Sequence, residues 1–447
     1  MEIIIKLSQF LLSLSLLIIL HELGHFIPAK IFKTRVEKFY LFFDVKFSLL
    51  KKKIGETEYG IGWLPLGGYV KIAGMIDESM DKEQMALPPQ PWEFRSKPAW
   101  QRLIIMLGGV TVNFVLAFII YIGVAFSFGD LYLNNSELKD GIAVKSQVGE
   151  DLGFKNGDII VTVDGQIIEH FDEIPAKILF SKSVVIRRNG VEQKINFPVD
   201  LIDKVLAGEK RPFIGLRQPF LVGKTGSSSE NRNTLLPKDV IKSINGQTTK
   251  YSDEVVSIII NNKSKIVDAV IVRNNEDVNV KLAIDKNGKL GVFQAFYDYQ
   301  SLEKLGLYNF DEKKYSFFES VPVGILKGKN QLLGYFDQLK AIFSPETGAY
   351  KGVGGFYAIF NVFPATWSWE VFWNITALLS IMLGVVNLLP IPALDGGHVV
   401  FLLYEMVSGK KPSDKFLESA QMVGFFILIA LVLFANGNDI FKAIIGK

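Results

Sequence analysis

The motif with the clearest chemistry is His21-Glu22-Leu23-Gly24-His25, which ends the first long apolar run of the chain. Two histidines four residues apart on a helix are offset by roughly 40° and about 6 Å, so both imidazoles can reach one ion. The glutamate beside the first histidine can take a proton from a water molecule at that ion. The motif therefore indicates a hydrolytic zinc site, with His21 and His25 as ligands and Glu22 as the general base.

A chance match is the alternative interpretation of this motif. The chain has only four histidines, which makes a coincidence rare. A charged glutamate at the end of a membrane-length segment also costs free energy unless it has a partner or a chemical role. Both points favour the metal site.

Composition indicates membrane spans combined with water-soluble domains. The 447 residues are 49% hydrophobic, and the mean hydropathy is positive. The net charge of +3 is small, and no basic stripe with interleaved aromatic residues indicates nucleic-acid binding. The absence of cysteine excludes thiolate metal sites, catalytic cysteine and disulfides, but leaves the compartment open.

The first span is expected at residues 3–28 and is expected to be retained, because the metal motif stands where a signal-peptide cleavage site would be. The roughly 18 residues before His21 rise about 27 Å, so the metal site should lie on the far side of the bilayer from the N-terminus. By the positive-inside rule, the basic loop at 31–100 is cytoplasmic, and the N-terminus and region 130–300 lie outside. The basic residues behind this orientation are Lys30, Lys33, Arg35, Lys38, Lys51, Lys52, Lys53, Arg95, Lys97 and Arg102.

A glycine-rich, aromatic stretch at 59–72 within this loop predicts a membrane-associated β-hairpin at about 58–75. One interpretation is a plain surface hairpin. The other is an exposed strand edge that holds an extended peptide by main-chain hydrogen bonds, with Gly67, Gly68, Tyr69 and Val70 as substrate contacts.

The second span is expected at 103–128, within a segment at 101–129. Gly108, Gly109 and Asn113 lie near its cytoplasmic end. Small residues allow close helix contact, and an asparagine in lipid usually faces a partner helix. We interpret all three as packing residues.

Region 130–300 changes to short alternating apolar runs and contains an internal repeat. The segment 154–166 recurs weakly at 236–247, and each copy is followed by an apolar-Gly-apolar triplet, at 214–216 and 290–292. The spacing predicts two domains, at 130–219 and 220–302. Their pattern resembles circularly permuted bacterial PDZ domains, which either capture a peptide C-terminus or act as steric caps.

The remaining chain predicts a helix and two further spans. An amphipathic helix at the membrane surface is expected within 303–368, at about residues 315–339. Pro390 and Pro392 interrupt a third transmembrane segment at 369–408, because proline removes a backbone donor and breaks a helix. The fourth span is expected at 416–437.

A catalytic zinc site needs a third protein ligand, and two sources compete. Glu37 and Asp44 follow the first helix, as the third ligand does in soluble zincins, but both fall in the charged loop. Asp395 lies in the broken membrane segment, level with His25, where an unpaired carboxylate is costly. We favour Asp395, although an N-cap role for the helix after it is an alternative that can coexist with metal binding.

Two motifs in this chain resemble the signatures of site-2 protease intramembrane metalloproteases. They are H-E-L-G-H at 21–25 and N-x-x-P-x-P-x-x-D-G, which starts at Asn387 and contains Asp395. With the glycine-rich loop and the paired repeats, the chain is most similar to the RseP (regulator of sigma-E protease) branch. The second repeat departs from the first by having Lys238 in place of Gly157, which puts its ligand binding in question.

The resemblance implies Zn2+ bound by His21, His25 and Asp395, and Glu22 as the catalytic acid/base. It implies that Asn387 positions the substrate or stabilises the oxyanion. We assign Pro390 and Pro392 as substrate contacts. His398 is either a partner of the metal ligands or a packed helix residue.

The predicted fold is a polytopic α-helical membrane protein with four transmembrane helices, the third broken, and an inserted extracytoplasmic tandem of PDZ-like domains. The predicted function is intramembrane cleavage of single-span membrane proteins in the bacterial inner membrane. The resemblance implies anti-sigma factors and remnant signal peptides as substrates, after their ectodomains are trimmed, with the PDZ-like domains as a gate. The rival hypothesis is a non-proteolytic adaptor that binds peptide C-termini around a structural zinc. A transporter fits less well, because the spans show no inverted repeat.

Overall fold

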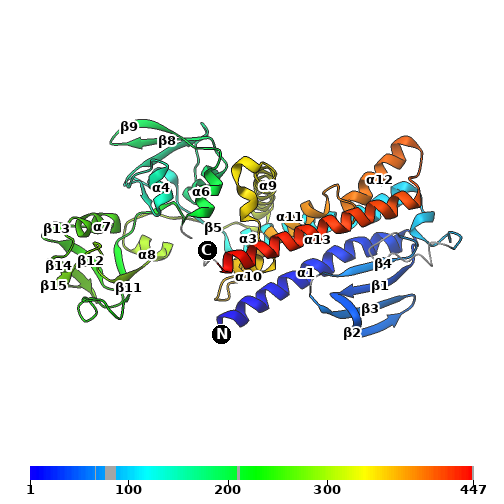
Figure 1. Ribbon diagram of the computed structural model, residues 1–447, viewed down its shortest axis with the longest axis horizontal. Coiled ribbons are helices and arrows are strands. Elements are labelled where there is room, and N and C mark those ends of the chain that lie inside the picture. The colour runs from blue at the N-terminus through cyan, green and yellow to red at the C-terminus, as the bar shows by residue number, and fades with distance from the viewer. Residues whose placement is uncertain (66, 76–86, 209–211, 445–447) are drawn as a thin grey trace. The chain divides into compact units, whose positions relative to one another are not determined.

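The computed structural model describes residues 1–65, 67–75, 87–208 and 212–444 (Figure 1). The chain folds into two compact units. Unit 1 comprises Met1–Gly129, Lys314–Lys340 and Gly352–Lys447. Unit 2 comprises Asp130–Lys313 and Ala341–Lys351.

Four helices in the described part of unit 1 are long and apolar enough to cross a membrane. They are α1 (Glu2–Ile31), α3 (Ala99–Phe128), α11 (Trp369–Asn387) and α13 (Asp414–Ile444). After α11 the chain leaves helical geometry at 388–394 and resumes as α12 (Asp395–Ser408). The predicted fold class, with four long apolar helices, a broken third segment and an inserted β-rich region, is therefore confirmed.

Helix α3 is the centre of unit 1 and packs against α1, α11 and α12. Its crossing with α1 depends on Gly24 and Gly108. A Cβ built on Gly24 would lie 2.4 Å from the carbonyl oxygen of Gly108, and a Cβ on Gly108 would lie 1.9 Å from that of Gly24. Side chains at either position would force the helices apart, so the two glycines fix the distance between α1 and α3.

A four-stranded sheet follows α1, and its topology corrects the predicted hairpin at 58–75. Its strands are β1 (Val36–Leu41), β2 (Phe43–Ile54), β3 (Thr57–Leu64) and β4 (Tyr69–Ile72), in the order β2-β3-β1-β4. Strand β1 lies between β3 and β4, pairing parallel with β3 and antiparallel with β4. The lysines of 36–54 made this stretch look like a loop, but Val36 and Tyr40 on β1 are fully buried and anchor the sheet.

Helix α9 (Phe317–Ile342) corresponds to the expected amphipathic helix, but its packing differs from a helix that only lies on a membrane surface. Gly324 and Gly328 face α3, where an added Cβ would lie 2.4 Å from the backbone of Ile122 and 2.5 Å from the ring of Phe118. The small-xxx-small spacing explains this close approach to a membrane-length helix.

Unit 2 contains two β-rich cores, which we call the first and second PDZ-like domains. The first contains β5 (Asp130–Tyr132), β6 (Ile142–Val144), α4 (Gln147–Asp151), β7 (Ile159–Val163), α5 (Ile174–Leu179), β8 (Ser183–Arg188), β9 (Val191–Asn196), α6 (Leu201–Ala207) and β10 (Ile214–Leu216). The second contains β11 (Phe220–Thr225), β12 (Val240–Ile244), β13 (Gln247–Thr248), α7 (Ser252–Ile260), β14 (Ile266–Arg273), β15 (Glu276–Ala283) and β16 (Val292–Ala295).

The structure corrects the expected boundary between 302 and 303. Leu302 on α8 (Tyr299–Lys304), Tyr308 and Phe310 all belong to the core of the first PDZ-like domain. Strand β17 (Asp311–Lys313) also returns to pair with β5. The second domain is thus an insertion in the first. The sequence pattern missed this, because nothing local in 297–313 shows which core these apolar residues join.

The internal repeat is visible as the same ion pair in both domains. Asp158 accepts hydrogen bonds from Arg188 Nε at 2.7 Å and Nη2 at 2.6 Å. Asp239 accepts from Arg273 in the same way, at 2.8 and 2.6 Å. Each aspartate starts a core strand segment and each arginine ends the neighbouring strand, so the repeat extends to its buried polar contacts.

Candidate metal centre

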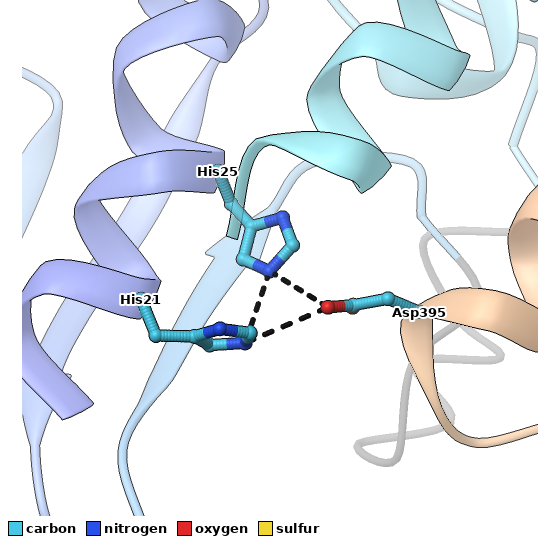
Figure 2. A group of neighbouring side chains, drawn as sticks. All are labelled: His21, His25 and Asp395. Carbon is cyan, nitrogen blue, oxygen red and sulfur yellow. Dashed lines mark hydrogen bonds and ion pairs between the residues drawn. The ribbon is translucent and has the colours of Figure 1, made fainter. Parts of the chain in front are cut away.

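Three side chains from two distant parts of the sequence converge on one point in unit 1 (Figure 2). Nε2 of His21 and Nε2 of His25 lie 3.3 Å apart. The Oδ2 atom of Asp395 lies 3.5 Å from the first nitrogen and 3.4 Å from the second. All three side chains are largely buried, and Figure 2 shows both rings turned toward the carboxylate.

The spacing of these three atoms fits a zinc ion. Nitrogen and oxygen ligands about 2.0–2.1 Å from a tetrahedral zinc lie about 3.3–3.4 Å from one another. Oδ2 of Asp395 is also buried without a hydrogen-bond partner among the described residues. A buried carboxylate oxygen that is left unsatisfied is costly, and a cation between it and the two imidazoles removes that cost. The donor set of two imidazoles and one carboxylate is typical of catalytic zinc.

Helix α3 orients both histidine rings. Nδ1 of His25 lies 2.8 Å from the carbonyl oxygen of Ile105, so Nδ1 carries the proton and Nε2 is left for the ion. The side-chain amide of Asn113 lies 3.0 Å from Nδ1 of His21. The atom that makes this contact is Nδ2 of Asn113, so the amide packs against the ring nitrogen of His21 that is not the one nearest Asp395.

Gly109 leaves room for the metal centre. A Cβ at this position would lie 2.4 Å from Nε2 of His25 and 2.7 Å from Cε1 of His21. Any side chain would therefore collide with the ligand atoms. The sequence assigned Gly109 and Asn113 to helix packing, whereas both lie against the candidate ligands His21 and His25. The spacing Gly-x-x-x-Asn puts them on one helix face, which is the signal that could have identified them.

Asp395 is the first residue of α12, and the competing ligands lie elsewhere. The residue before α12 is Leu394, and no side chain caps the helix there, so the N-cap role is not observed. Asp44 accepts a hydrogen bond from Tyr69 at 2.9 Å, and Glu37 pairs with Lys71 at 3.4 Å. Neither carboxylate joins the histidine pair.

A cavity of about 590 Å3 opens onto this centre. Glu22 and Asn387 line it together with the three candidate ligands. The Nδ2 atom of Asn387, the last residue of α11, lies 3.3 Å from Nε2 of His21. Glu22 thus provides a carboxylate, and Asn387 an amide donor, beside the position of the ion.

The same cavity is lined by Gly67, Gly68, Tyr69 and Val70, the residues predicted to bind substrate. A Cβ on Gly68 would lie 2.4 Å from Ile18 Cγ2 and 3.6 Å from Glu22 Cγ, so the missing side chain lets this segment approach α1. Strand β4 ends the sheet, and its second edge has no strand partner among the described residues.

The two prolines assigned as substrate contacts lie outside this cavity. Neither Pro390 nor Pro392 is among the described residues that line it. Pro390 is exposed, and Pro392 packs against Gly397 and Gly424. These prolines shape the break between α11 and α12, while Ala393 and Leu394 from the same break do line the cavity. His398 also lines it.

Tyr69 is held as a hydrogen-bond donor at the rim of the cavity. Burial raises the pKa of Tyr69 above its usual value, and its hydrogen bond to the carboxylate of Asp44 raises the pKa further. The hydroxyl therefore stays protonated at neutral pH. This bond ties β4 to the start of β2.

The segment of this chain that matches a known protein family includes all three candidate ligands. Peptidase family M50 matches residues 9–431. Proteins named "Putative zinc metalloprotease" from Campylobacter jejuni and Rickettsia conorii are 28% and 27% identical over 446 and 448 residues. These alignments cover 98% and 96% of this chain, and 93% and 97% of the relatives. The PDZ domain of an SdrC-like protein from Listeria monocytogenes matches 20% of this chain and 95% of its own, at 19% identity and a TM-score of 0.16.

Proposed function

The chain belongs to peptidase family M50 and is a multi-pass membrane zinc metalloprotease, and from this premise we propose that it cleaves single-span membrane proteins within or at the edge of their transmembrane segments. The observation that carries the proposal is the shared cavity. It brings His21, His25, Asp395 and Glu22 together with the edge of β4 that has no strand partner among the described residues, next to helices of membrane length.

The residues of the cavity divide the chemistry among them. His21, His25 and Asp395 would hold zinc, which polarises the scissile carbonyl and lowers the pKa of water to about 7. Glu22 takes a proton from the attacking water and returns it to the leaving amide nitrogen. Asn387 donates a hydrogen bond toward the charge that develops on the carbonyl oxygen.

The edge of β4 can bind a helical substrate after its scissile segment has unwound. The amides of a transmembrane helix are hydrogen-bonded within the helix, so the scissile segment must unwind before it is cut. An unwound segment can replace those hydrogen bonds by pairing with the free edge of β4 as an added strand. Gly67 and Gly68 keep this edge close to α1.

Within family M50, we propose that the chain belongs to the RseP branch. We place the protein in the bacterial inner membrane, with the sheet on the cytoplasmic side and the PDZ-like domains on the periplasmic side. The basic residues around the sheet support this orientation. Substrates are then anti-sigma factors and remnant signal peptides whose ectodomains have already been trimmed. The adaptor hypothesis leaves Glu22 without a role in a cavity that contains the metal ligands.

The test is cleavage of a trimmed single-span reporter by the purified protein and by Glu22→Gln, with zinc content measured in both. We expect zinc in both and cleavage only in the wild type. A general acid/base typically contributes about 10²–10⁴-fold, so the variant should lose at least that much activity. Equal cleavage would remove Glu22 from the mechanism. Zinc without cleavage in either protein would support the adaptor.

The gating role of the PDZ-like domains is tested separately by deletion. The deletion must remove Asp130–Lys313 as a whole, because residues from both ends of this range build the first core and β5 pairs with β17. The deleted protein should cut untrimmed reporters that the intact protein rejects. Continued rejection of untrimmed reporters would refute the gate.

A further inference from the structure

The segment that carries the third ligand is held by α13, the last membrane-length helix. Ala393, two residues before Asp395, has φ +86°, in the left-handed region that alanine rarely adopts. Its backbone N–H donates a hydrogen bond of 3.1 Å to Oε1 of Gln421. Gln421 is buried on α13, with 4% of its surface exposed.

Close backbone packing surrounds the same segment. A Cβ on Gly424, one turn after Gln421, would lie 1.4 Å from the carbonyl oxygen of Pro392. On the other side, a Cβ on Gly396 would lie 2.3 Å from the carbonyls of Leu388 and Leu389. The break at 388–394 is therefore wedged between the first turn of α12 and one turn of α13. A side chain on either glycine would displace it.

The hydrogen bond from Ala393 offsets an unfavourable backbone conformation. A non-glycine residue held in a sparsely populated backbone region costs roughly 1–3 kcal/mol and persists only where its surroundings impose it. Relaxing Ala393 to a common conformation would rotate the backbone that leads into Asp395. The carboxylate would then leave its position about 3.4 Å from the imidazoles of His21 and His25.

We propose that Gln421 is a positioning residue of the metal centre, which holds Ala393 in its left-handed conformation and so keeps Asp395 in reach of the ion. This inference rests on the proposed metal centre and deepens it. It adds α13 to the elements that build the site. The sequence predicted this helix only as the fourth transmembrane span, and its apolar pattern does not indicate a contact with the segment before Asp395.

The test uses the full-length protein and measures zinc affinity by competition with a chelator. Gln421→Met keeps the length of the side chain but removes the acceptor. Loss of a group that orients a metal ligand typically lowers metal affinity by about 10–100-fold, which is the change expected here. Met422→Leu is the matched control. This neighbouring residue is 44% exposed, and its substitution should leave zinc affinity unchanged.

A second substitution separates positioning from general damage. Glycine adopts φ +86° without strain, so Ala393→Gly in the Gln421→Met background should restore most of the lost affinity. The visible spectrum of the cobalt-loaded protein should change in Gln421→Met and revert in the double variant. In the metal-free protein, the amides of residue 391 and residues 393–395 should exchange faster in Gln421→Met than in Met422→Leu.

Several outcomes overturn the inference. They are wild-type zinc affinity in Gln421→Met, an equal loss in Met422→Leu, and a double variant no better than the single one. If Gln421→Met does not fold, Ala393→Val with Gln421 intact replaces it, and unchanged zinc affinity in that variant also overturns the inference. A wild-type protein that binds no zinc refutes the metal centre itself, whereas tight zinc binding by both wild type and Gln421→Met refutes only the role of Gln421.

Discussion

The carboxylates of Asp158 and Asp239 in unit 2 and of Asp395 in unit 1 differ in the hydrogen bonds that they accept. In unit 2, Asp158 accepts two bonds from Arg188 and one from the backbone N–H of Lys155 at 2.8 Å. Asp239 is surrounded in the same way. In unit 1, Oδ2 of Asp395 is buried with no hydrogen-bond partner among the described residues, and it lies 3.5 and 3.4 Å from the Nε2 atoms of His21 and His25.

This difference separates two structural carboxylates from a candidate metal ligand. A carboxylate with saturated oxygens stabilises the fold and offers no open position. A carboxylate oxygen that accepts no hydrogen bond and faces two imidazole nitrogens leaves a position that a cation can fill. Asp158 and Asp239 are almost fully buried, and the side chain of Asp395 is 14% exposed, so both burial and the number of hydrogen bonds separate them.

The largest effect is expected from Asp395→Asn, which tests whether Asp395 differs in role from Asp158. The variant should lose zinc affinity by more than the about 10–100-fold typical of an orienting residue, and lose cleavage with it, because the third candidate ligand is removed. Its metal-free form should stay close in stability to metal-free wild type, because asparagine keeps the shape of the side chain and Oδ2 of Asp395 accepts no hydrogen bond from the described residues. Zinc analysis and thermal unfolding with chelator measure both effects. A large loss of metal-free stability would show that Asp395 is structural, like Asp158.

Gly109→Ala tests whether zinc affinity depends on the space left beside the side chains of His21 and His25. The added Cβ would meet Nε2 of His25 at 2.4 Å, so we expect zinc affinity to fall by about 100-fold, as for loss of an orienting neighbour. Gly123→Ala on the same helix is the control, because its Cβ would meet no atom within 4 Å. Chelator competition on both variants gives the result. Equal affinities would mean that the histidines can retreat without losing the ion.

Arg188→Met tests the saturated carboxylate of unit 2. Removing one partner of a buried charge pair typically costs about 3–5 kcal/mol, so the free energy of unfolding of unit 2 should drop by up to that amount. Zinc affinity should not change. Arg187→Met is the control, because Arg187 lies next to it but pairs with exposed Glu192. Denaturant unfolding followed in unit 2 measures the loss, and a small effect of Arg188→Met would weaken the contrast with Asp395.

The smallest effect is expected at Asp140, a partly exposed carboxylate that links the two PDZ-like domains. Hydrogen bonds from Lys250 Nζ and Tyr251 OH lower the pKa of Asp140 below its ordinary value of 3.8. A lowered folded-state pKa means that this stabilisation is present above pH 3.8 and is lost as the pH falls through the folded-state value.

Asp140→Asn should therefore flatten the acid limb of the stability curve of unit 2, by less than about 1 kcal/mol because solvent screens the group. Unfolding measured between about pH 5 and about pH 3 provides the readout. An unchanged acid limb would mean that Asp140 adds no pH-dependent stability to the contact between the two domains.

The candidate metal ligands could be predicted from the sequence because each lies in a compact motif. His21 and His25 share one helix face, and Asp395 follows two prolines that break a membrane segment. Gly109 and Asn113 could not be assigned in this way, since their contacts exist only where α3 crosses α1 at Gly24 and Gly108. The contact between Gln421 and Ala393 likewise depends on tertiary packing across 28 residues of chain.

The fold was predicted best where the period of apolar residues was long and uninterrupted. Four membrane-length helices follow from such runs. Strand β1 was missed because Lys38 and its charged neighbours obscured the burial of Val36 and Tyr40. The closure of the first PDZ-like domain by Leu302, Tyr308 and Phe310 was missed because strand and helix patterns do not show which core a returning segment joins.

The second PDZ-like domain is inserted in the first at a single place, where the chain enters and leaves it. Its first strand, β11, pairs antiparallel with its last, β16, with Leu221 opposite Ala295, so the chain enters and leaves the domain at neighbouring points. A short linker could bridge that gap without disturbing the host domain, whose strands lie on both sides of it. The inserted domain therefore adds surface to unit 2 without lengthening the path between the two ends of the host domain.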